Sequence, residues 1–258
     1  MTILNVTPDS FFAGSRTPST EQIEQRVREA VHAGCNILDV GGYSSRPGAA
    51  EVSPDEEWHR VATGINVIRR IAPEMVVSVD TFRSTVARQA IETYGKIIIN
   101  DISAGEADEQ MWQVVAEADV PYIAMHMKGT PATMQHLTTY QDIVTEVVAY
   151  FEQRTTLMRK QGVRQVILDP GFGFAKTTEQ NFELLRGLHR LCALGYPVLA
   201  GVSRKSMIYK TLDTTPDRAL AGTVALGWEC LRQGATLLRV HDTQEAVDTI
   251  KLFKTFQR

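Results

Sequence analysis

Short runs of β-branched and apolar residues alternate along the chain with longer segments whose apolar residues recur every three or four positions. The short runs are typical of buried strands, and the longer segments are typical of amphipathic helices. Regular alternation of the two indicates parallel βαβ units, in which a helix connects neighbouring strands. The pattern predicts strands over residues 2–6, 36–40, 75–79, 97–100, 122–125, 165–168, 198–201 and 237–240.

A predicted helix follows each strand, and eight such units in 258 residues favour a closed (β/α)8 barrel, or TIM barrel. An open sheet usually has about five or six strands and a glycine fingerprint after the first, and no such fingerprint follows Val6. No linker interrupts the alternation, so the sequence predicts an α/β fold with a single domain over residues 1–258. Clear helical periods cover residues 20–33, 54–71, 84–94, 140–161 and 178–194.

Charge and cysteine content exclude several classes of partner. The formal net charge is −3 and no basic tract is present, which argues against a nucleic-acid or anionic-membrane partner. No apolar run approaches the ~20 residues that a membrane-spanning helix needs, and residues 1–10 do not resemble a signal peptide. The cysteines, Cys35, Cys192 and Cys230, are odd in number and show no metal-ligand or redox spacing. We therefore expect a cytoplasmic protein.

Polar residues stand at the ends of nearly all predicted strands. In a (β/α)8 barrel the active site lies at the C-terminal ends of the strands. A single Asp after a strand is more often a helix N-cap than a catalytic group. Polar residues at eight strand ends on one face nevertheless favour a functional site. They are Asn5 with residues 7–10, Asp39 with residues 41–48, Asp80, Asn100 with Asp101, His126, Asp169, residues 203–206, and Arg239 with His241 and Asp242.

The kinds of residue at these ends indicate a ligand with two halves. Asp80, Asn100 and Asp169 offer acceptors that suit the N–H donors of a flat aminopyrimidinone ring. Phe174, an aromatic residue in a polar loop, suits stacking on such a ring. His126 fits a buried structural role as well as it fits a role in the site. A second group suits phosphate oxygens or a leaving anion, namely Arg46, Lys205 and Arg239 together with His241.

Taken together, these segments resemble the dihydropteroate synthase family over essentially the whole chain. The resemblance implies an alkyl transferase that joins 6-hydroxymethyl-7,8-dihydropterin pyrophosphate to 4-aminobenzoate and releases pyrophosphate. It also implies a homodimer, sulfonamides as possible inhibitors, and Mg²⁺ as cofactor, an ion that is often bound through one or two protein groups plus substrate phosphates. The matching segments are residues 3–11, 39–48, 78–81, 99–102, 125–127, 168–174, 201–206 and 239–242.

The resemblance also implies roles for individual residues. The pterin would contact Asp80, Asn100, Met125, Asp169, Gly201, Lys205 and Arg239. Aminobenzoate would contact Phe11, Ser45, Arg46, Pro47, Phe174, Lys205 and Ser206. Pyrophosphate would contact Asn5, Arg46, Arg239 and His241, and Asn5 would also bind the metal. The catalytic set would be Asp80, Asp169, Lys205, Arg239 and His241.

Two departures and three alternatives qualify this interpretation. Tyr43 stands where the family commonly has an acidic residue, and Ser45 replaces a threonine, keeping the hydroxyl without the methyl group. A pterin-binding methyltransferase domain would share the barrel and the pterin carboxylates but needs no aminobenzoate loop. A non-catalytic pterin-binding paralogue would lose its anion-binding positions first. A lyase on this fold commonly needs a Schiff-base lysine within a strand, whereas Lys205 follows one.

Overall fold

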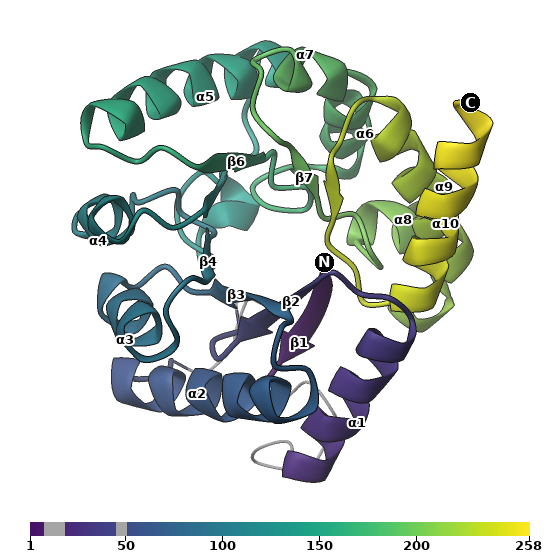
Figure 1. Cartoon of the computed structure of the whole chain (residues 1–258). Coiled ribbons are helices and arrows are strands. Elements are labelled where there is room, and N and C mark those ends of the chain that lie inside the picture. Colours follow the sequence, from purple (N-terminus) through teal and green to yellow (C-terminus); the bar gives the residue numbers. More distant parts are fainter. Residues whose placement is uncertain (8–18, 45–50) are drawn as a thin grey trace.

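The computed structural model describes residues 1–7, 19–44 and 51–258, and these residues form eight parallel strands inside a ring of helices (Figure 1). The predicted strands are confirmed, each boundary to within two residues. Their bounds are β1 Thr2–Asn5, β2 Ile37–Gly41, β3 Val76–Asp80, β4 Ile98–Asp101, β5 Tyr122–Met125, β6 Val166–Asp169, β7 Leu199–Ala200 and β8 Leu237–Leu238.

The strands close into a barrel through a few backbone pairs. Strands β1 to β6 form one sheet in sequence order, and β7 pairs with β8. The amide of Leu168 in β6 donates to the carbonyl of Pro197 at 2.9 Å, which joins the sheet to the segment before β7. The amide of Ile3 in β1 donates to the carbonyl of Val240 at 2.9 Å, just after β8. The predicted (β/α)8 barrel is therefore confirmed.

Two helices differ from their predicted bounds. The helix predicted from residue 140 begins later, as α5 (Ile143–Lys160), because the Asp142 carboxylate caps the helix by accepting from the Thr145 amide at 3.0 Å. The helix predicted over 178–194 divides at Gly187, where an added Cβ would lie 2.6 Å from Val144 of α5. The helices are α1 Thr20–His32, α2 Pro54–Ile71, α3 Ser84–Tyr94, α4 Met111–Ala118, α5 Ile143–Lys160, α6 Thr178–Arg186, α7 Leu188–Cys192, α8 Ser206–Thr211, α9 Leu220–Arg232 and α10 Thr243–Phe256, with 3-10 turns at Met134–His136 and Pro216–Arg218.

The two-residue period of each strand places polar side chains at the mouth of the barrel. Ile98, Ile123 and Leu199 face inward and form the barrel interior with Ile37, Ile167 and Leu237. Because side chains alternate along a strand, the residue two positions further on also faces inward, nearer the C-terminal end. In strand order these positions hold Asp39, Asn100, Met125, Asp169, Gly201 and Arg239.

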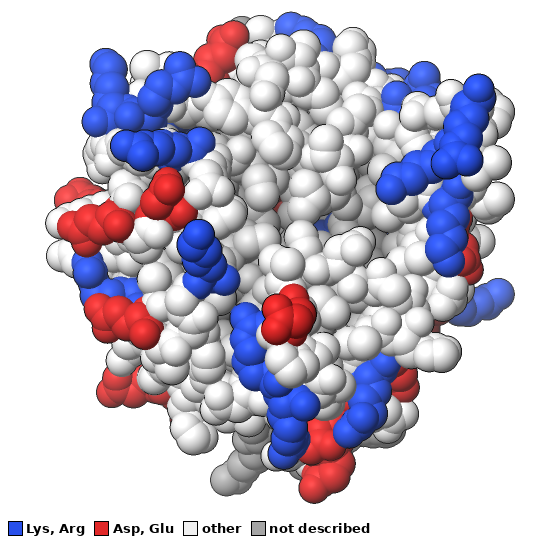
Figure 2. All heavy atoms as spheres, in the orientation of Figure 1, with Lys and Arg blue, Asp and Glu red and all other residues white. Residues whose placement is uncertain are grey.

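Charged groups lie mostly at the edge of the molecular face in Figure 2, where Lys and Arg are interspersed with Asp and Glu around a largely uncharged centre. In the part of the chain that the structure describes, no helix is both long enough and apolar enough to cross a membrane.

Candidate active site

A cavity of about 770 Å³ lies at the C-terminal ends of the strands. This volume is typical of a site for a small molecule. Phe11, Ser45, Arg46 and Pro47 lie outside the described residues. All other residues to which the resemblance assigns a role line this one cavity, and they are Asn5, Asp80, Asn100, Met125, Asp169, Phe174, Gly201, Lys205, Ser206, Arg239 and His241. The strand-end residues Asp39, Asp101, His126 and Asp242 do not line it.

An ion-pair network occupies the floor of the cavity. Arg239 Nε lies 2.7 Å from Asp39 Oδ2, and Arg239 Nη2 lies 2.6 Å from Asp80 Oδ2. Burial alone would lower the pKa of Arg239, but the two carboxylates raise it above its ordinary value. Burial raises the pKa of Asp80 to about 7, although Arg239 opposes this shift. The guanidinium is thus already engaged by carboxylates, which leaves it less charge to offer an anion than the sequence suggested.

Asp39, which the sequence placed among the strand-end polar residues without a specific role, is central to this network. Its side chain is fully buried, and both carboxylate oxygens are used. Asn100 Nδ2 donates to Asp39 Oδ2 at 3.1 Å, which fixes the orientation of the amide because only its nitrogen can donate. The sequence carried a signal for an inward-facing carboxylate, since Asp39 stands two residues after Ile37 and therefore faces inward.

Among the described residues predicted to contact the pterin, Asp80, Asn100 and Asp169 each keep one acceptor oxygen for a ligand. Asp169 Oδ1 accepts from the Gly171 amide at 2.8 Å, and Asp80 Oδ2 accepts from Arg239. Among the residues that the structure describes, no protein group donates to Asp169 Oδ2, Asp80 Oδ1 or Asn100 Oδ1. Burial raises the pKa of Asp169, as expected for a carboxylate that lacks donors on one side. A ring edge with several N–H donors would satisfy all three oxygens.

An aromatic and apolar wall lies on another side of the cavity. Lys205 Nζ donates to the Phe172 carbonyl at 2.7 Å and lies 4.4 Å from the centre of the Phe174 ring. Burial lowers the pKa of Lys205 to about 8. Met125 packs in an apolar cluster that Phe174 adjoins. At Gly201 an added Cβ would meet only Arg239 Cβ, at 3.9 Å, so packing within the protein does not require glycine there.

His241 is a neutral imidazole that Ser203 holds in place. Its backbone amide donates to Ser203 Oγ at 3.1 Å, and Ser203 Oγ lies 3.1 Å from His241 Nδ1. The Ser203 hydroxyl therefore contacts both the backbone and the ring of His241 and holds the imidazole in place. Burial, helped by Arg239, lowers the pKa of His241 to about 4. The imidazole is therefore uncharged near pH 7.

Comparison with known proteins decides the family. The family model described as pterin binding enzyme matches residues 1–241 of the chain. The chain is 42% identical to the dihydropteroate synthase of Synechocystis sp., over 98% of this chain and 88% of that protein. The chain belongs to the dihydropteroate synthase family.

Solved structures of dihydropteroate synthases share the fold over nearly the whole chain. The enzyme of Xanthomonas albilineans with 4-aminobenzoic acid has a TM-score of 0.89 and 37% identity, covering 99% of this chain and 92% of that one. The Yersinia pestis enzyme in complex with a sulfonamide drug has a TM-score of 0.91 and 35% identity, covering 99% of this chain and 93% of that one.

Tyr43, which departs from the dihydropteroate synthase pattern, packs against Phe82 and Arg83. The Tyr43 and Phe82 rings meet edge-to-face with centroids 5.2 Å apart. The Arg83 guanidinium lies 5.2 Å from the Tyr43 ring centre and is paired at 2.6 Å with Glu57, which is fully buried. The aromatic ring at this position is therefore fixed against a rigid ion pair.

The donors available to a metal are few. No group of three or more His, Cys, Asp or Glu side chains suited to a metal occurs within residues 1–7, 19–44 and 51–258. Asn5 lines the cavity, and its amide makes no hydrogen bond to another described residue. One neutral oxygen cannot hold Mg²⁺ alone, but Mg²⁺ commonly combines one or two protein oxygens with substrate phosphates and water. The residues present fit that mode of binding.

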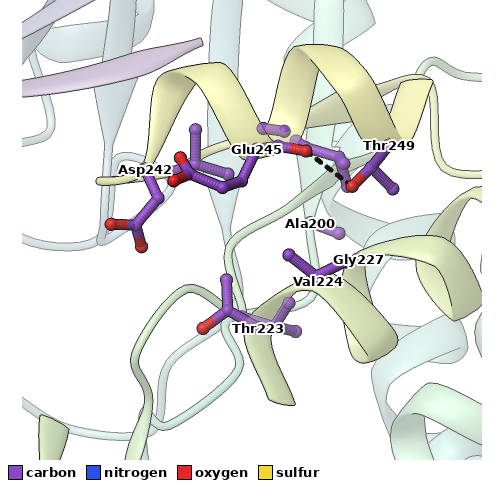
Figure 3. Close-up of a pocket in the computed structure, with 11 residues that line it drawn as sticks. Ala200, Thr223, Val224, Gly227, Asp242, Glu245 and Thr249 are labelled. Carbon is purple, nitrogen blue, oxygen red and sulfur yellow. Dashed lines mark hydrogen bonds between the residues drawn. The ribbon is translucent and has the colours of Figure 1, made fainter. Parts of the chain in front are cut away.

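A second cavity lies between β7, β8 and helices α9 and α10 (Figure 3). Its volume is about 20 Å³, which is room for roughly one water molecule. Val224, Gly227 and Ala200 line it, and the Thr249 hydroxyl beside it donates to the Glu245 carbonyl at 2.6 Å. This cavity is too small for a substrate.

Proposed function

We propose that the protein condenses 6-hydroxymethyl-7,8-dihydropterin pyrophosphate with 4-aminobenzoate, giving 7,8-dihydropteroate and pyrophosphate in folate biosynthesis. The observation that carries this proposal is the division of one cavity into two parts. Three free acceptor oxygens, on Asp80, Asn100 and Asp169, suit the N–H edge of a pterin. Lys205, Arg239 and the N–H of His241 suit a departing anion. The Xanthomonas albilineans relative with 4-aminobenzoic acid supports the second substrate.

The chemistry is a substitution at the pterin methylene carbon. The C–O bond to pyrophosphate breaks with its electron pair leaving on oxygen, and the pterin ring shares the positive charge that develops. The lone pair of the aryl amine then forms the C–N bond, and the amine loses a proton. Asp80 and Asp169 favour the developing cation, while Arg239 and His241 favour the departing anion. Preorganised charge of this kind dominates many active sites.

Mg²⁺ would be held by Asn5 together with pyrophosphate oxygens, and it would supply neutralisation of the leaving charge. The ion-pair network supports a need for such an ion. Asp39, Asp80 and Arg239 together carry a net negative charge when both carboxylates are ionised, so the cavity floor alone attracts a second anion poorly.

We propose further that the protein is a cytoplasmic homodimer whose aminobenzoate site also accepts sulfonamides. The Yersinia pestis relative with a sulfonamide drug supports the inhibitor class. The free thiols of Cys35, Cys192 and Cys230 are consistent with a reducing compartment. Leu252 and Phe256 of α10 are 65% and 78% exposed, an apolar surface that a second copy could cover. Sedimentation velocity tests the dimer.

The deciding experiment is pyrophosphate release measured with each substrate alone and with both. Release that requires the pterin pyrophosphate and 4-aminobenzoate together, with label from aminobenzoate appearing in dihydropteroate, is the expected result. A methyltransferase domain would transfer no aminobenzoate label. A non-catalytic paralogue would bind pterin and release nothing, and either outcome would overturn the proposal.

Removing the hydroxyl that orients His241 should weaken the handling of the leaving group. In Ser203→Ala the imidazole loses the contact that holds its ring, so we expect kcat/KM to fall about fivefold, as for one lost hydrogen bond of roughly 1 kcal/mol. Affinity for 6-hydroxymethyl-7,8-dihydropterin, which lacks pyrophosphate, should not change. An equal loss for both ligands would show that His241 does not address pyrophosphate.

Removing the proposed metal ligand should raise the Mg²⁺ requirement. For Asn5→Ala we expect the Mg²⁺ concentration at half-maximal activity to rise about tenfold or more, because one direct ligand is lost. The matched control is Asn36→Ala, which removes an exposed amide from the opposite end of the barrel. Half-maximal Mg²⁺ concentrations that agree between the two variants would rule out Asn5 as a ligand.

A further inference from the structure

Lys176 is a buried lysine that the sequence analysis passed over and that does not line the cavity. It ends the loop between β6 and α6, and only 6% of its surface is exposed. Its ammonium nitrogen lies 3.0 Å from the Gly171 carbonyl oxygen, 2.9 Å from that of Phe174 and 3.1 Å from His126 Nδ1. The His126 carbonyl oxygen is a fourth, longer contact at 3.4 Å. One cation therefore joins two ends of the loop to the end of β5.

The loop that Lys176 ties together forms part of the cavity wall. Its Gly171 amide donates to Asp169, its Phe172 carbonyl accepts from Lys205, and its Phe174 ring lies under the Lys205 ammonium. Gly171 has φ +68°, and an added Cβ would lie 2.1 Å from the His126 carbonyl oxygen. The loop thus packs directly against the residue after β5. Small shifts of the loop would move both the Phe174 ring and Lys205.

A lysine suits this position for a chemical reason. Two backbone carbonyls and an imidazole nitrogen converge on one point behind the cavity wall, and an ammonium group has three N–H donors to satisfy them. The burial that lowers the pKa of His126 to about 2 keeps that ring neutral and able to accept. Burial lowers the pKa of Lys176 to about 7, a shift that Asp169 opposes and that Lys205 and Lys128 increase. A buried carbonyl that lost its donor would drive the loop to rearrange.

We propose that Lys176 is a positioning residue for the aminobenzoate subsite: its ammonium holds the β6–α6 loop against the end of β5 and so sets where the Phe174 ring and Lys205 stand. This inference rests on the proposed function. The three free acceptors for the pterin lie on strands, and the loop reaches the pterin only through the Gly171 amide and Lys205. The Phe174 ring for aminobenzoate, in contrast, lies on the loop itself, so the larger effect falls on the second substrate.

The test separates the two substrates by their KM values. In Lys176→Met, which keeps the length of the side chain and removes its donors, we expect KM for aminobenzoate to rise about tenfold or more. KM for the pterin pyrophosphate should change less than about threefold. The control is Lys128→Met, which removes a nearby ammonium that lies 3.5 Å from the Tyr140 ring centre and is paired with Glu146, outside the loop. A purely structural role would lower the melting temperature and leave both KM values unchanged in the folded protein.

Two further comparisons keep the outcomes distinct. If Lys176→Met is not recovered folded, Lys176→Gln, which retains one N–H donor group, decides by the same ratio of KM values. A wild-type protein that forms no dihydropteroate contradicts the proposed function itself. A wild-type protein that is active, together with a folded variant whose aminobenzoate KM is unchanged, overturns the role of Lys176 alone.

Discussion

Replacing Arg239 by methionine should destabilise the fold by about 3–5 kcal/mol and remove nearly all turnover. Methionine fills much of the same space but leaves the Asp39 carboxylate fully buried without its cation. Asn100 still donates to Asp39, yet one neutral donor does not replace a guanidinium at 2.7 Å. Breaking a buried pair costs far more than the pair contributes, because the remaining charge is uncompensated. The loss of turnover follows because the same side chain lies at the floor of the proposed anion site.

Chemical denaturation monitored by far-UV circular dichroism measures the change in unfolding free energy. The control is Arg232→Met on α9, whose partner Glu229 lies 2.6 Å away but whose own side chain is 60% exposed. Solvent screens such pairs, so a loss of at most about 1 kcal/mol is expected there. In the double variant Asp39→Asn with Arg239→Met, stability should partly return while activity stays absent. Unfolding free energies of Arg239→Met and Arg232→Met that agree would contradict the network.

Much of the candidate site follows from the two-residue period of the strands. Ile98 and Asn100, or Ile167 and Asp169, are two positions apart, so an inward apolar residue predicts an inward polar one at the mouth of the barrel. The same rule predicts that Asp39, two positions after Ile37, faces inward. What the period cannot supply is the partner across the barrel, since Asp39 and Arg239 are 200 residues apart in sequence.

Pairing between residues far apart in the chain also explains why the role predicted for Arg239 was too simple. A cation at a strand end suits phosphate, and its two carboxylate partners become visible only when the barrel closes. Lys176 escaped notice for the same reason, because its acceptors lie on the loop after β6 and on His126, 50 residues earlier. Gly187, where one predicted helix divides, likewise has no room for a side chain because Val144 of another helix lies against it. Local period predicts which way a side chain faces, but not what it meets.

The Asp169→Asn variant should lose about 2–3 kcal/mol of pterin binding, which corresponds to a Kd roughly 30- to 150-fold higher. In the native protein Asp169 Oδ1 accepts from the Gly171 amide at 2.8 Å. An asparagine would keep that bond by placing its oxygen there, because its nitrogen cannot accept a hydrogen bond. Its NH₂ group would then occupy the position of the free Oδ2. The NH₂ group of the asparagine and the N–H edge of the pterin are both donors and would face each other. In the native protein the Oδ2 acceptor faces that N–H edge.

Calorimetry with 6-hydroxymethyl-7,8-dihydropterin measures this loss, and a second strand-end carboxylate supplies the control. Asp101 is also fully buried, but its oxygens accept from Ser103, Gly105 and the Tyr122 hydroxyl, and it does not line the cavity. Asp101→Asn should therefore lower the unfolding free energy while the folded protein binds pterin with unchanged Kd. Both variants remove one buried negative charge at a strand end, so only a direct contact with the ligand can separate their affinities. If Asp169→Asn binds pterin as tightly as Asp101→Asn, then Asp169 does not contact the ring and the acceptor half of the cavity has been wrongly assigned.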